Sequence, residues 1–341
     1  MSSLLRESVK SGAAVLLAVF LFGACGYLVG NDSAAEVAAG GIQLRKEARI
    51  SIEKERLTIQ LRKVTVEYEF LNTTNQDITT EVAFPTPPYT HGFDNYYGVY
   101  RLSDFRVWVD GREVNYQIEA KANLKGTDYT DYLRSLGIEI HTFGKLDPLR
   151  LPIPDGYWKH SQIQKLPKSI KDELIRNGLL DKEYGGPTWT VFRTYHWNQL
   201  FPAHRILRVK HEYEPVIGLA QFPREEIQSE VPNSCTDTSL EQKLRKVQRK
   251  YLKSGPADSL QFVMASWVKY ILTSANNWMT PMKSFELVVE DPTPDQHYRP
   301  ISTTVCWDGK VVRLDEKRWS ATRVNYLPSS ELAVYYFQEF K

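Results

Sequence analysis

The sequence predicts a mainly β protein: a β-sandwich with a mixed helical insertion, followed by a helical segment and C-terminal strands. Apolar residues alternate with polar ones in stretches such as Val64–Phe70, as a half-buried strand requires. Asp110-Gly111 and Asp308-Gly309 are strong tight-turn dipeptides. Several short strands follow one another at regular spacing, which favours a sandwich over a parallel βαβ sheet. With 42% hydrophobic and 12% aromatic residues, the chain has enough apolar material for a sizeable core.

Residues 1–30 are typical of an export segment. A short charged start leads into Gly12–Gly30, which contains no charged residue, and the chain then turns polar. Three fates remain open. A signal peptide is cleaved near Ala24 or Gly30, or Cys25 is lipidated at the end of a lipobox-like sequence, or the segment stays as a membrane anchor. Each predicts an exported protein that is periplasmic or envelope-associated, with membrane attachment in the last two.

The first folded part is expected over residues 31–220. Its sandwich comes from residues 42–120 and 188–220, with strands predicted by alternation and bounded by turn residues or proline. These strands are Ile50–Leu61, Val64–Phe70, Thr80–Phe84, Phe105–Val109, Val114–Ile118, Trp189–His196 and Arg205–Tyr213. Residues 122–187 form a mixed insertion with short helices at Asp128–Leu136 and Lys168–Leu180.

The second part, residues 221–341, is expected to begin with a helical segment over 239–275. Helical periodicity covers Ser239–Lys253 and continues in Asp258–Leu272 after a break at Pro256. Strands then follow within residues 284–337, with Asp308-Gly309 as a hairpin turn between two of them. They either complete the first sandwich or form a second, smaller one. They are Phe285–Val289, Ser302–Trp307, Lys310–Leu314, Trp319–Asn325 and Leu332–Phe337.

The cysteines suggest one cross-link. Cys25 lies in the export segment, which leaves Cys235 and Cys306 as an even pair in a chain bound for an oxidising compartment. We expect a disulfide between them. The alternative is two buried thiols.

Charge and motifs exclude several functional classes. The formal net charge of +2, from 43 basic and 41 acidic residues, gives no argument for nucleic-acid binding. The seven histidines show no metal-ligand spacing, and no nucleophile elbow or phosphate-binding glycine loop occurs. We therefore predict no metal, no cofactor and no recognisable catalytic residue.

Two aromatic and polar segments and one aromatic loop are candidates for a binding surface. Such residues combine flat apolar contact with directed hydrogen bonds, although packing in the core or at a strand end is the simpler interpretation. The aromatic loop around Tyr96 and Tyr97 also holds Tyr89 and Tyr100. For this loop, a binding surface and packing over the end of the sandwich are equally good interpretations. The candidates are His196, Trp197, Asn198, Asn277, Trp278, Tyr96 and Tyr97.

Several of these stretches resemble a known family. The mature start at residues 31–41, Val66–Pro85, Trp197–Pro202 leading to His211–Pro215, and Tyr270–Pro281 resemble a bacterial secreted family catalogued as domain of unknown function 4424. Cys235 and Cys306 fall where that family carries cysteines. The family name implies no activity and no functional residues.

A looser resemblance concerns the fold alone. The strand and turn order that leads into Asp110–Val114 is similar to the sandwich beside von Willebrand A domains in inter-alpha-trypsin-inhibitor proteins.

Two functions follow from these observations. The first is a non-enzymatic binding or structural protein of the bacterial cell envelope, with an envelope protein or a glycan as partner. The second is an envelope hydrolase or carbohydrate-active enzyme, in which His196, Trp197, Asn277 and Trp278 would converge on one pocket beside a carboxylate. The absence of paired titratable groups in the sequence pattern favours the first.

Overall fold

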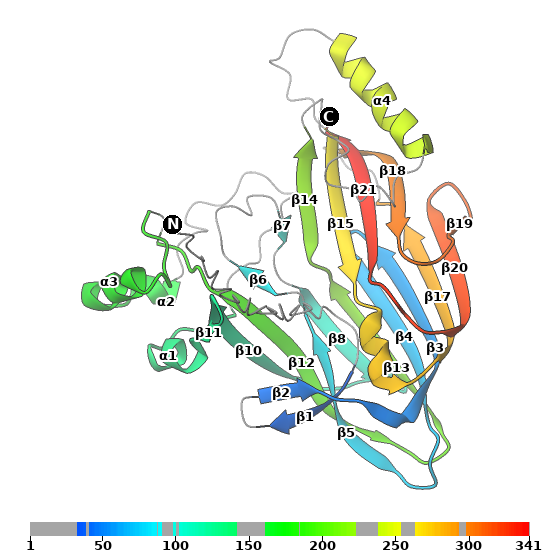
Figure 1. Cartoon of the computed structure of the whole chain (residues 1–341), viewed down its shortest axis with the longest axis horizontal. Coiled ribbons are helices and arrows are strands. Elements are labelled where there is room, and N and C mark those ends of the chain that lie inside the picture. The colour runs from blue at the N-terminus through cyan, green and yellow to red at the C-terminus, as the bar shows by residue number, and fades with distance from the viewer. Residues whose placement is uncertain are drawn as a thin grey trace, which may run out of the picture.

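The computed structural model describes most of the chain (Figure 1). The described residues are 33–38, 41–86, 88–90, 98–99, 102–141, 161–183, 185–222, 238–253, 263–292 and 298–340. They form three β-sheets with α-helices packed against two of them, which confirms the mainly β class and the sandwich. The export segment, Cys25, Tyr96, Tyr97 and Cys235 lie outside the described residues.

The largest sheet has nine strands and draws on both ends of the chain. β3 lies at its centre, antiparallel to β4 and parallel to β17, so an early strand and a late one are direct neighbours. The sequence left open whether the late strands complete the first sandwich or form a second one. Because β17 pairs with β3, they complete the same body. In order, the strands are β19 (Val312–Arg313), β20 (Arg318–Tyr326), β17 (Met282–Glu290), β3 (Glu47–Gln60), β4 (Lys63–Asn72), β13 (Ile206–Glu214), β8 (Ser103–Val109) and β9 (Arg112–Glu113), with β16 (Trp278–Met279) beside β3.

Two smaller sheets complete the β structure. The seven-stranded sheet runs β11 (Thr127–Asp128), β10 (Gln117–Leu124), β12 (Thr190–Phe201), β5 (Ile78–Pro85), β1 (Ser33–Ala38) and β2 (Gly41–Leu44), with β6 (Tyr89–Thr90) beside β12. The five-stranded sheet runs β18 (Tyr298–Cys306), β21 (Leu332–Phe340), β15 (Val263–Tyr270), β14 (Ile217–Phe222) and β7 (Gly98–Val99).

One continuous hydrophobic core joins the three sheets. It contains Leu57 of the nine-stranded sheet, Trp197 of the seven-stranded sheet and Val334 of the five-stranded sheet, all buried. The inner face of the nine-stranded sheet is therefore covered by both smaller sheets. Because successive side chains of a strand point to opposite faces, the charged residues between these core positions lie on its outer face.

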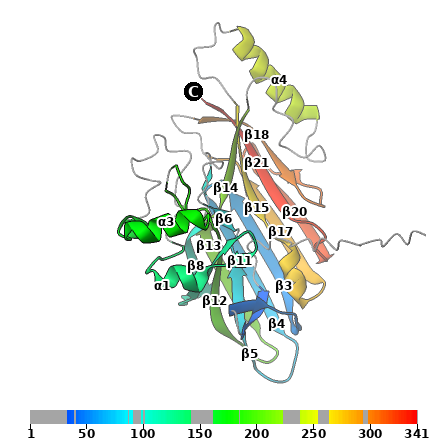
Figure 2. The same ribbon diagram turned by 60° about the vertical axis from the view of Figure 1, so that its left-hand side comes forward.

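Helices pack against the two smaller sheets at separate places (Figure 2). The insertion supplies α1 (Thr130–Ser135), α2 (Ser161–Gln164) and α3 (Lys168–Arg176), which share a second core with Trp189 and Val191. α4 (Thr238–Lys253) packs Leu240 and Leu244 on the five-stranded sheet. The predicted helices at Asp128–Leu136, Lys168–Leu180 and Ser239–Lys253 are confirmed with small shifts of their ends.

Three predictions of local structure are wrong. Asp258–Leu272 was expected to be helical, but the structure has β15 over its second half. β15 pairs with β14 and β21 and is apolar on both faces, because the main core lies on one side and α4 on the other. A strand buried on both faces gives a continuous apolar run, which periodicity alone does not distinguish from a buried helix.

The two other errors concern connections. β18 and β19, on either side of Asp308-Gly309, belong to different sheets, so this dipeptide does not close a hairpin. Asp308 instead accepts hydrogen bonds from Tyr326 (2.8 Å) and Ser329 (2.9 Å). The strand expected at Val114–Ile118 begins only at Gln117, as the start of β10, because the chain leaves the nine-stranded sheet after β9 and crosses to the seven-stranded sheet.

Candidate functional site

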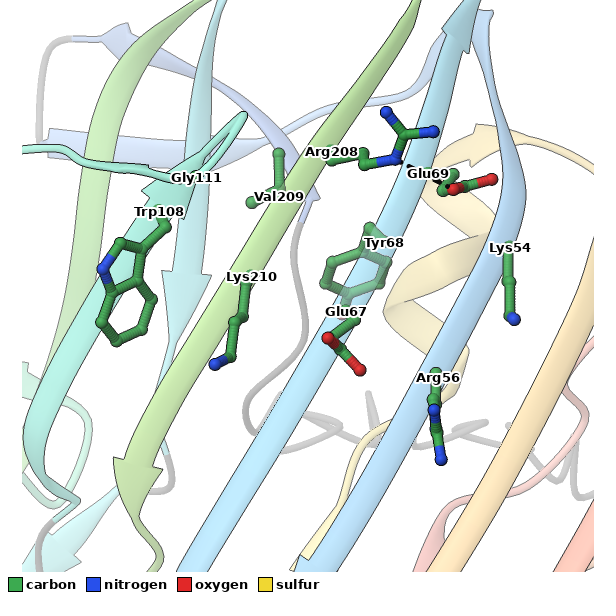
Figure 3. A pocket seen from close by; sticks show the side chains of 10 residues that line it. All are labelled: Lys54, Arg56, Glu67, Tyr68, Glu69, Trp108, Gly111, Arg208, Val209 and Lys210. Carbon is green, nitrogen blue, oxygen red and sulfur yellow. Dashed lines mark hydrogen bonds and ion pairs between the residues drawn. The ribbon is translucent and has the colours of Figure 1, made fainter.

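The outer face of the nine-stranded sheet holds a hollow of about 520 Å³ (Figure 3). Four adjacent strands, β3, β4, β13 and β8, form its floor. Among the described residues, no helix packs on this face. The residues that line the hollow are Lys54, Arg56, Glu67, Tyr68, Glu69, Trp108, Gly111, Arg208, Val209 and Lys210.

Strand register arranges the charges of the hollow in two rows. In the first row Arg56 pairs with Glu67, Glu67 with Lys210, and Lys210 with Trp108. In the second row Glu69 lies between Lys54 and Arg208. Each row therefore crosses the sheet with alternating sign, the arrangement in which opposite charges on neighbouring strands stabilise one another. Adjacent strands lie about 4.8 Å apart, so the first row spans about 14 Å.

Trp108 ends the first row and is half-buried between two cations. The Arg106 guanidinium lies 4.7 Å from the centre of the indole ring, and the Lys210 ammonium lies 5.1 Å from it. Both are within the range of cation–π attraction. Glu113 accepts two hydrogen bonds from Arg106, at 2.8 and 2.6 Å. This hydrogen bonding holds the pKa of Glu113 below its usual value.

A tight hairpin fixes the tryptophan beside the hollow. Asp110 and Gly111 both adopt positive φ, 46° and 80°, in the turn between β8 and β9. Positive φ at both central residues defines the two-residue turn whose twist matches that of the flanking strands. This turn confirms the prediction made from Asp110-Gly111. Asp110 also exchanges hydrogen bonds with Arg208, accepting at its carboxylate (3.0 Å) and donating from its backbone N–H (2.8 Å).

Carboxylates pair with every cation that lines the hollow. Arg208 contacts Glu69 at 3.2 Å, and Lys210 contacts Glu212 at 2.8 Å. The hydrogen bond from Lys210 lowers the pKa of Glu212 against the opposing effect of burial. Lys54 and Arg56 both approach Glu286, at 3.8 and 3.7 Å. The hollow therefore presents positively charged hydrogen-bond donors and carboxylate hydrogen-bond acceptors side by side on a rigid floor.

The structure places the candidates from β12 on two opposite faces. Trp197 joins the main core, with its ring 5.5 Å from that of His211. His196 points the other way, and its Nδ1 lies 2.7 Å from Glu81. Asn198 is exposed. Consecutive strand residues point to opposite faces, so Trp197 is separated from His196 and Asn198, which share the other face of β12.

The second pair of candidates lies at the end of the 3₁₀ helix Thr273–Asn277, where Asn277 is the last helical residue and Trp278 follows it. Trp278 is fully buried against Phe70 and Phe201. Asn277 donates a hydrogen bond to the Ser33 hydroxyl at 2.9 Å. Trp197 and Trp278 are thus core residues. Tyr89, from the aromatic loop, is buried and donates to the His141 carbonyl (3.0 Å).

Cys306 ends β18 and is disulfide-bonded. Its partner is outside the described residues, which contain no complete disulfide. The specific pairing with Cys235 stays a prediction, as does lipidation of Cys25.

A buried polar cluster was not foreseen from the sequence. Glu55 is fully buried in the main core and accepts a hydrogen bond from the Tyr270 hydroxyl at 3.0 Å, which in turn lies 3.0 Å from the Tyr68 hydroxyl. Burial, reinforced by the charge of Glu55, raises the pKa of Tyr270 well above its ordinary value. The tyrosine therefore remains protonated and donates to the carboxyl.

The residues of the hollow were also missed, although a signal for them exists. In Phe105–Val109 the alternation places Arg106 and Trp108 on the face opposite the apolar residues. A tryptophan at an outward position, flanked by charge, is the feature that could have indicated an exposed site.

The described residues contain no group of three or more His, Cys, Asp or Glu side chains arranged to hold a metal ion. Among those residues there is also no helix of the length and apolarity needed to cross a membrane.

Comparison with protein families identifies the chain. The model of a family described as Domain of unknown function (DUF4424) matches residues 30–335. The chain belongs to the DUF4424 family. This confirms the resemblance seen in the sequence. No curated protein matches the chain.

Among solved structures, similarity of sequence and shape is low. A protein from Legionella pneumophila described as a nutrient binding candidate is 13% identical, with a TM-score of 0.38 over 92% of this chain and 72% of that one. Yeast LTA4 hydrolase is 10% identical, with a TM-score of 0.28 over 84% and 28%. An M1 zinc metallopeptidase from Deinococcus radiodurans is 8% identical, with a TM-score of 0.26 over 85% and 43%. The chain spans less than half the length of each of these two enzymes.

Proposed function

We propose that this DUF4424 protein is a non-enzymatic binding protein of the bacterial cell envelope, and that the hollow around Trp108 binds a glycan. The observation that carries the proposal is the row Arg56–Glu67–Lys210–Trp108, which crosses four strands of an open sheet face. An aromatic ring with closely spaced donors and acceptors suits a ligand that has both apolar faces and many hydroxyl groups.

The spacing of the row supports a linear sugar chain. Charged side chains recur about every 4.8 Å across the strands. This repeat is close to the advance of one β-linked pyranose ring along a glycan. A ligand laid across the strands would therefore place one sugar ring over each strand, with Trp108 under its end.

The charge of the face narrows the ligand further. Both signs alternate along the rows, so a purely anionic polymer would meet Glu67 and Glu69 as well as the cations. The complement of such a face is a glycan that bears carboxylates together with amino or amide groups. Bacterial cell-wall glycan, with its N-acetylated sugars and short peptides, has this chemistry.

The β-sheet makes the site ready for binding. Hydrogen-bonded strands, cation–π contacts and ion pairs hold the side chains of the hollow before a ligand arrives. Such preorganisation lowers the entropy lost on association. The cell-envelope location rests on the apolar stretch Gly12–Gly30, which we propose exports the chain and, if retained or lipidated at Cys25, attaches it to a membrane.

Binding to cell-wall material tests the proposal. The purified full chain is titrated by calorimetry with soluble fragments released from bacterial sacculi by a muramidase. We expect saturable binding that Trp108→Ala weakens at least tenfold. Phe192→Ala provides the control, because Phe192 is an exposed aromatic residue on the seven-stranded sheet, away from the hollow.

A second comparison separates charge recognition from a general loss of charge. Lys210 and Lys283 are both exposed lysines of the nine-stranded sheet paired with a glutamate, at 2.8 and 2.7 Å, but only Lys210 lines the hollow. We expect Lys210→Gln to weaken binding and Lys283→Gln to leave it unchanged. No binding by the unmodified chain, or equal binding by it and Trp108→Ala, would overturn the proposal.

A further inference from the structure

A second, smaller cavity lies where α4 meets the edges of two sheets. Its volume is about 220 Å³, enough for a small molecule. It is formed by α4, β18 of the five-stranded sheet, and β19 and β20 of the nine-stranded sheet, and shares no residue with the hollow around Trp108. Its lining residues are Leu240, Lys243, Asp291, Ile301, Ser302, Thr303, Thr304, Arg313 and Trp319.

The wall of this cavity is cationic and rich in hydroxyl groups. Lys243 and Arg313 face a single carboxyl, that of Asp291. Burial raises the pKa of Asp291, while a hydrogen bond from Thr303 and the charges of Arg313, Lys243 and Lys317 act in the opposite direction. The lining therefore carries two cations, Lys243 and Arg313, and one acid whose ionisation is disfavoured by burial, which gives the cavity an excess of positive charge.

Arg313 is held in place by its neighbours. Its Nε donates to the Asp315 carbonyl at 2.9 Å and its Nη2 donates to the Glu316 carbonyl at 2.8 Å, while the guanidinium lies 5.7 Å from the ring centre of Trp319. A guanidinium has five N–H donors, so these two bonds leave about three for a ligand. A fixed, planar donor group is the arrangement that recognises phosphate or carboxylate oxygens.

Lys243 supplies a second cation from the helix. Its ammonium donates to the Ser302 hydroxyl at 3.2 Å, which links α4 to the edge strand β18. The ammonium carries three donors in total, so this bond leaves two. The Ser302 hydroxyl, fixed by Lys243, can direct its own proton to a bound oxygen.

We propose that this cavity binds the phosphate group of a small molecule. Two cations from different elements, together with the hydroxyl of Ser302, match a compact dianion with several acceptor oxygens. The site is independent of the glycan site and does not rest on it.

Calorimetry of the full chain with inorganic phosphate at low ionic strength tests this inference. We expect one binding site per chain, and at least tenfold weaker binding by Arg313→Gln and by Lys243→Gln. Lys246→Gln is the matched control, because Lys246 is an exposed lysine of the same helix that does not line the cavity. Circular dichroism confirms that each variant is folded.

Further outcomes separate this site from its alternatives. Trp108→Ala, which removes the aromatic ring of the other hollow, is expected to bind phosphate as the unmodified chain does. Acetate is expected to bind at least tenfold more weakly than phosphate. The proposal is overturned by a lack of phosphate binding, by equal affinity for acetate, or by equal affinities of Arg313→Gln, Lys246→Gln and the unmodified chain.

Discussion

Replacing Tyr270 with phenylalanine removes one hydroxyl from the centre of the core. That hydroxyl donates to Glu55 at 3.0 Å and lies 3.0 Å from the Tyr68 hydroxyl, with all three side chains buried. A hydrogen bond to a charged group contributes about 1.5–3 kcal/mol and a neutral one about 0.5–1.5 kcal/mol. We therefore expect Tyr270→Phe to lower the free energy of unfolding by about 2–4 kcal/mol.

Urea titration followed by circular dichroism measures this change, with the slope expected to stay constant. Tyr129→Phe is the control, because the Tyr129 hydroxyl makes no hydrogen bond within the described residues; its effect is expected to stay within about 0.5 kcal/mol. The Tyr68→Phe single and double variants complete a cycle with an expected coupling of about 0.5–3 kcal/mol. A Tyr270→Phe effect as small as the control's would refute the importance of the buried cluster.

Three further predictions concern backbone packing, alkaline stability and the cross-link. Gly218→Ala would drive a methyl group into the Trp267 ring, so we expect the free energy of unfolding in urea titration to fall by about 1–3 kcal/mol, and no fall would contradict this packing. The pKa of Tyr270 in the folded protein is raised above its unfolded value of about 10. The contribution of Tyr270 to the free energy of unfolding is therefore complete below about pH 10 and declines above it. Unfolding titrations from pH 8 to 12 should show a shallower decline for Tyr270→Phe, and parallel declines would contradict this. Cys306→Ser should lower stability by about 2–5 kcal/mol under oxidising conditions, and peptide mapping without reductant should find Cys306 linked to Cys235; unlinked peptides or unchanged stability would oppose it.

Much of the fold could be read from alternation and turn residues. β3, β4, β8, β13 and β17 each have one face in the core and one facing outward, and such strands carry a clear period of two. β15 could not be recognised in this way, because both of its faces are covered and its apolar residues run together. The sheet to which β18 and β19 belong is likewise set by long-range pairing, which a local turn signal does not determine.

The candidate site was harder to predict because it depends on register between strands. Arg56, Glu67, Lys210 and Trp108 are far apart in sequence and become one row only when β3, β4, β13 and β8 pair. The tryptophans that the sequence singled out lie in the core instead.

The buried Glu55 did leave a trace in the sequence. The apolar positions change phase between Ile52 and Leu57, where the register of β3 with β4 shifts. A phase change of this kind indicates a bulge, and a bulge re-aims the side chains that follow it.

Lysine acetylation footprinting with soluble cell-wall fragments tests the glycan-binding face most directly. Lys54, Lys210 and Lys283 are similarly exposed on the nine-stranded sheet, at 45%, 41% and 56% of the side chain, but only the first two line the hollow. The account predicts that the fragments slow acetylation of Lys54 and Lys210 and leave Lys283 unchanged. Equal acetylation of all three lysines with and without fragments, or protection of Lys283 alone, would contradict it.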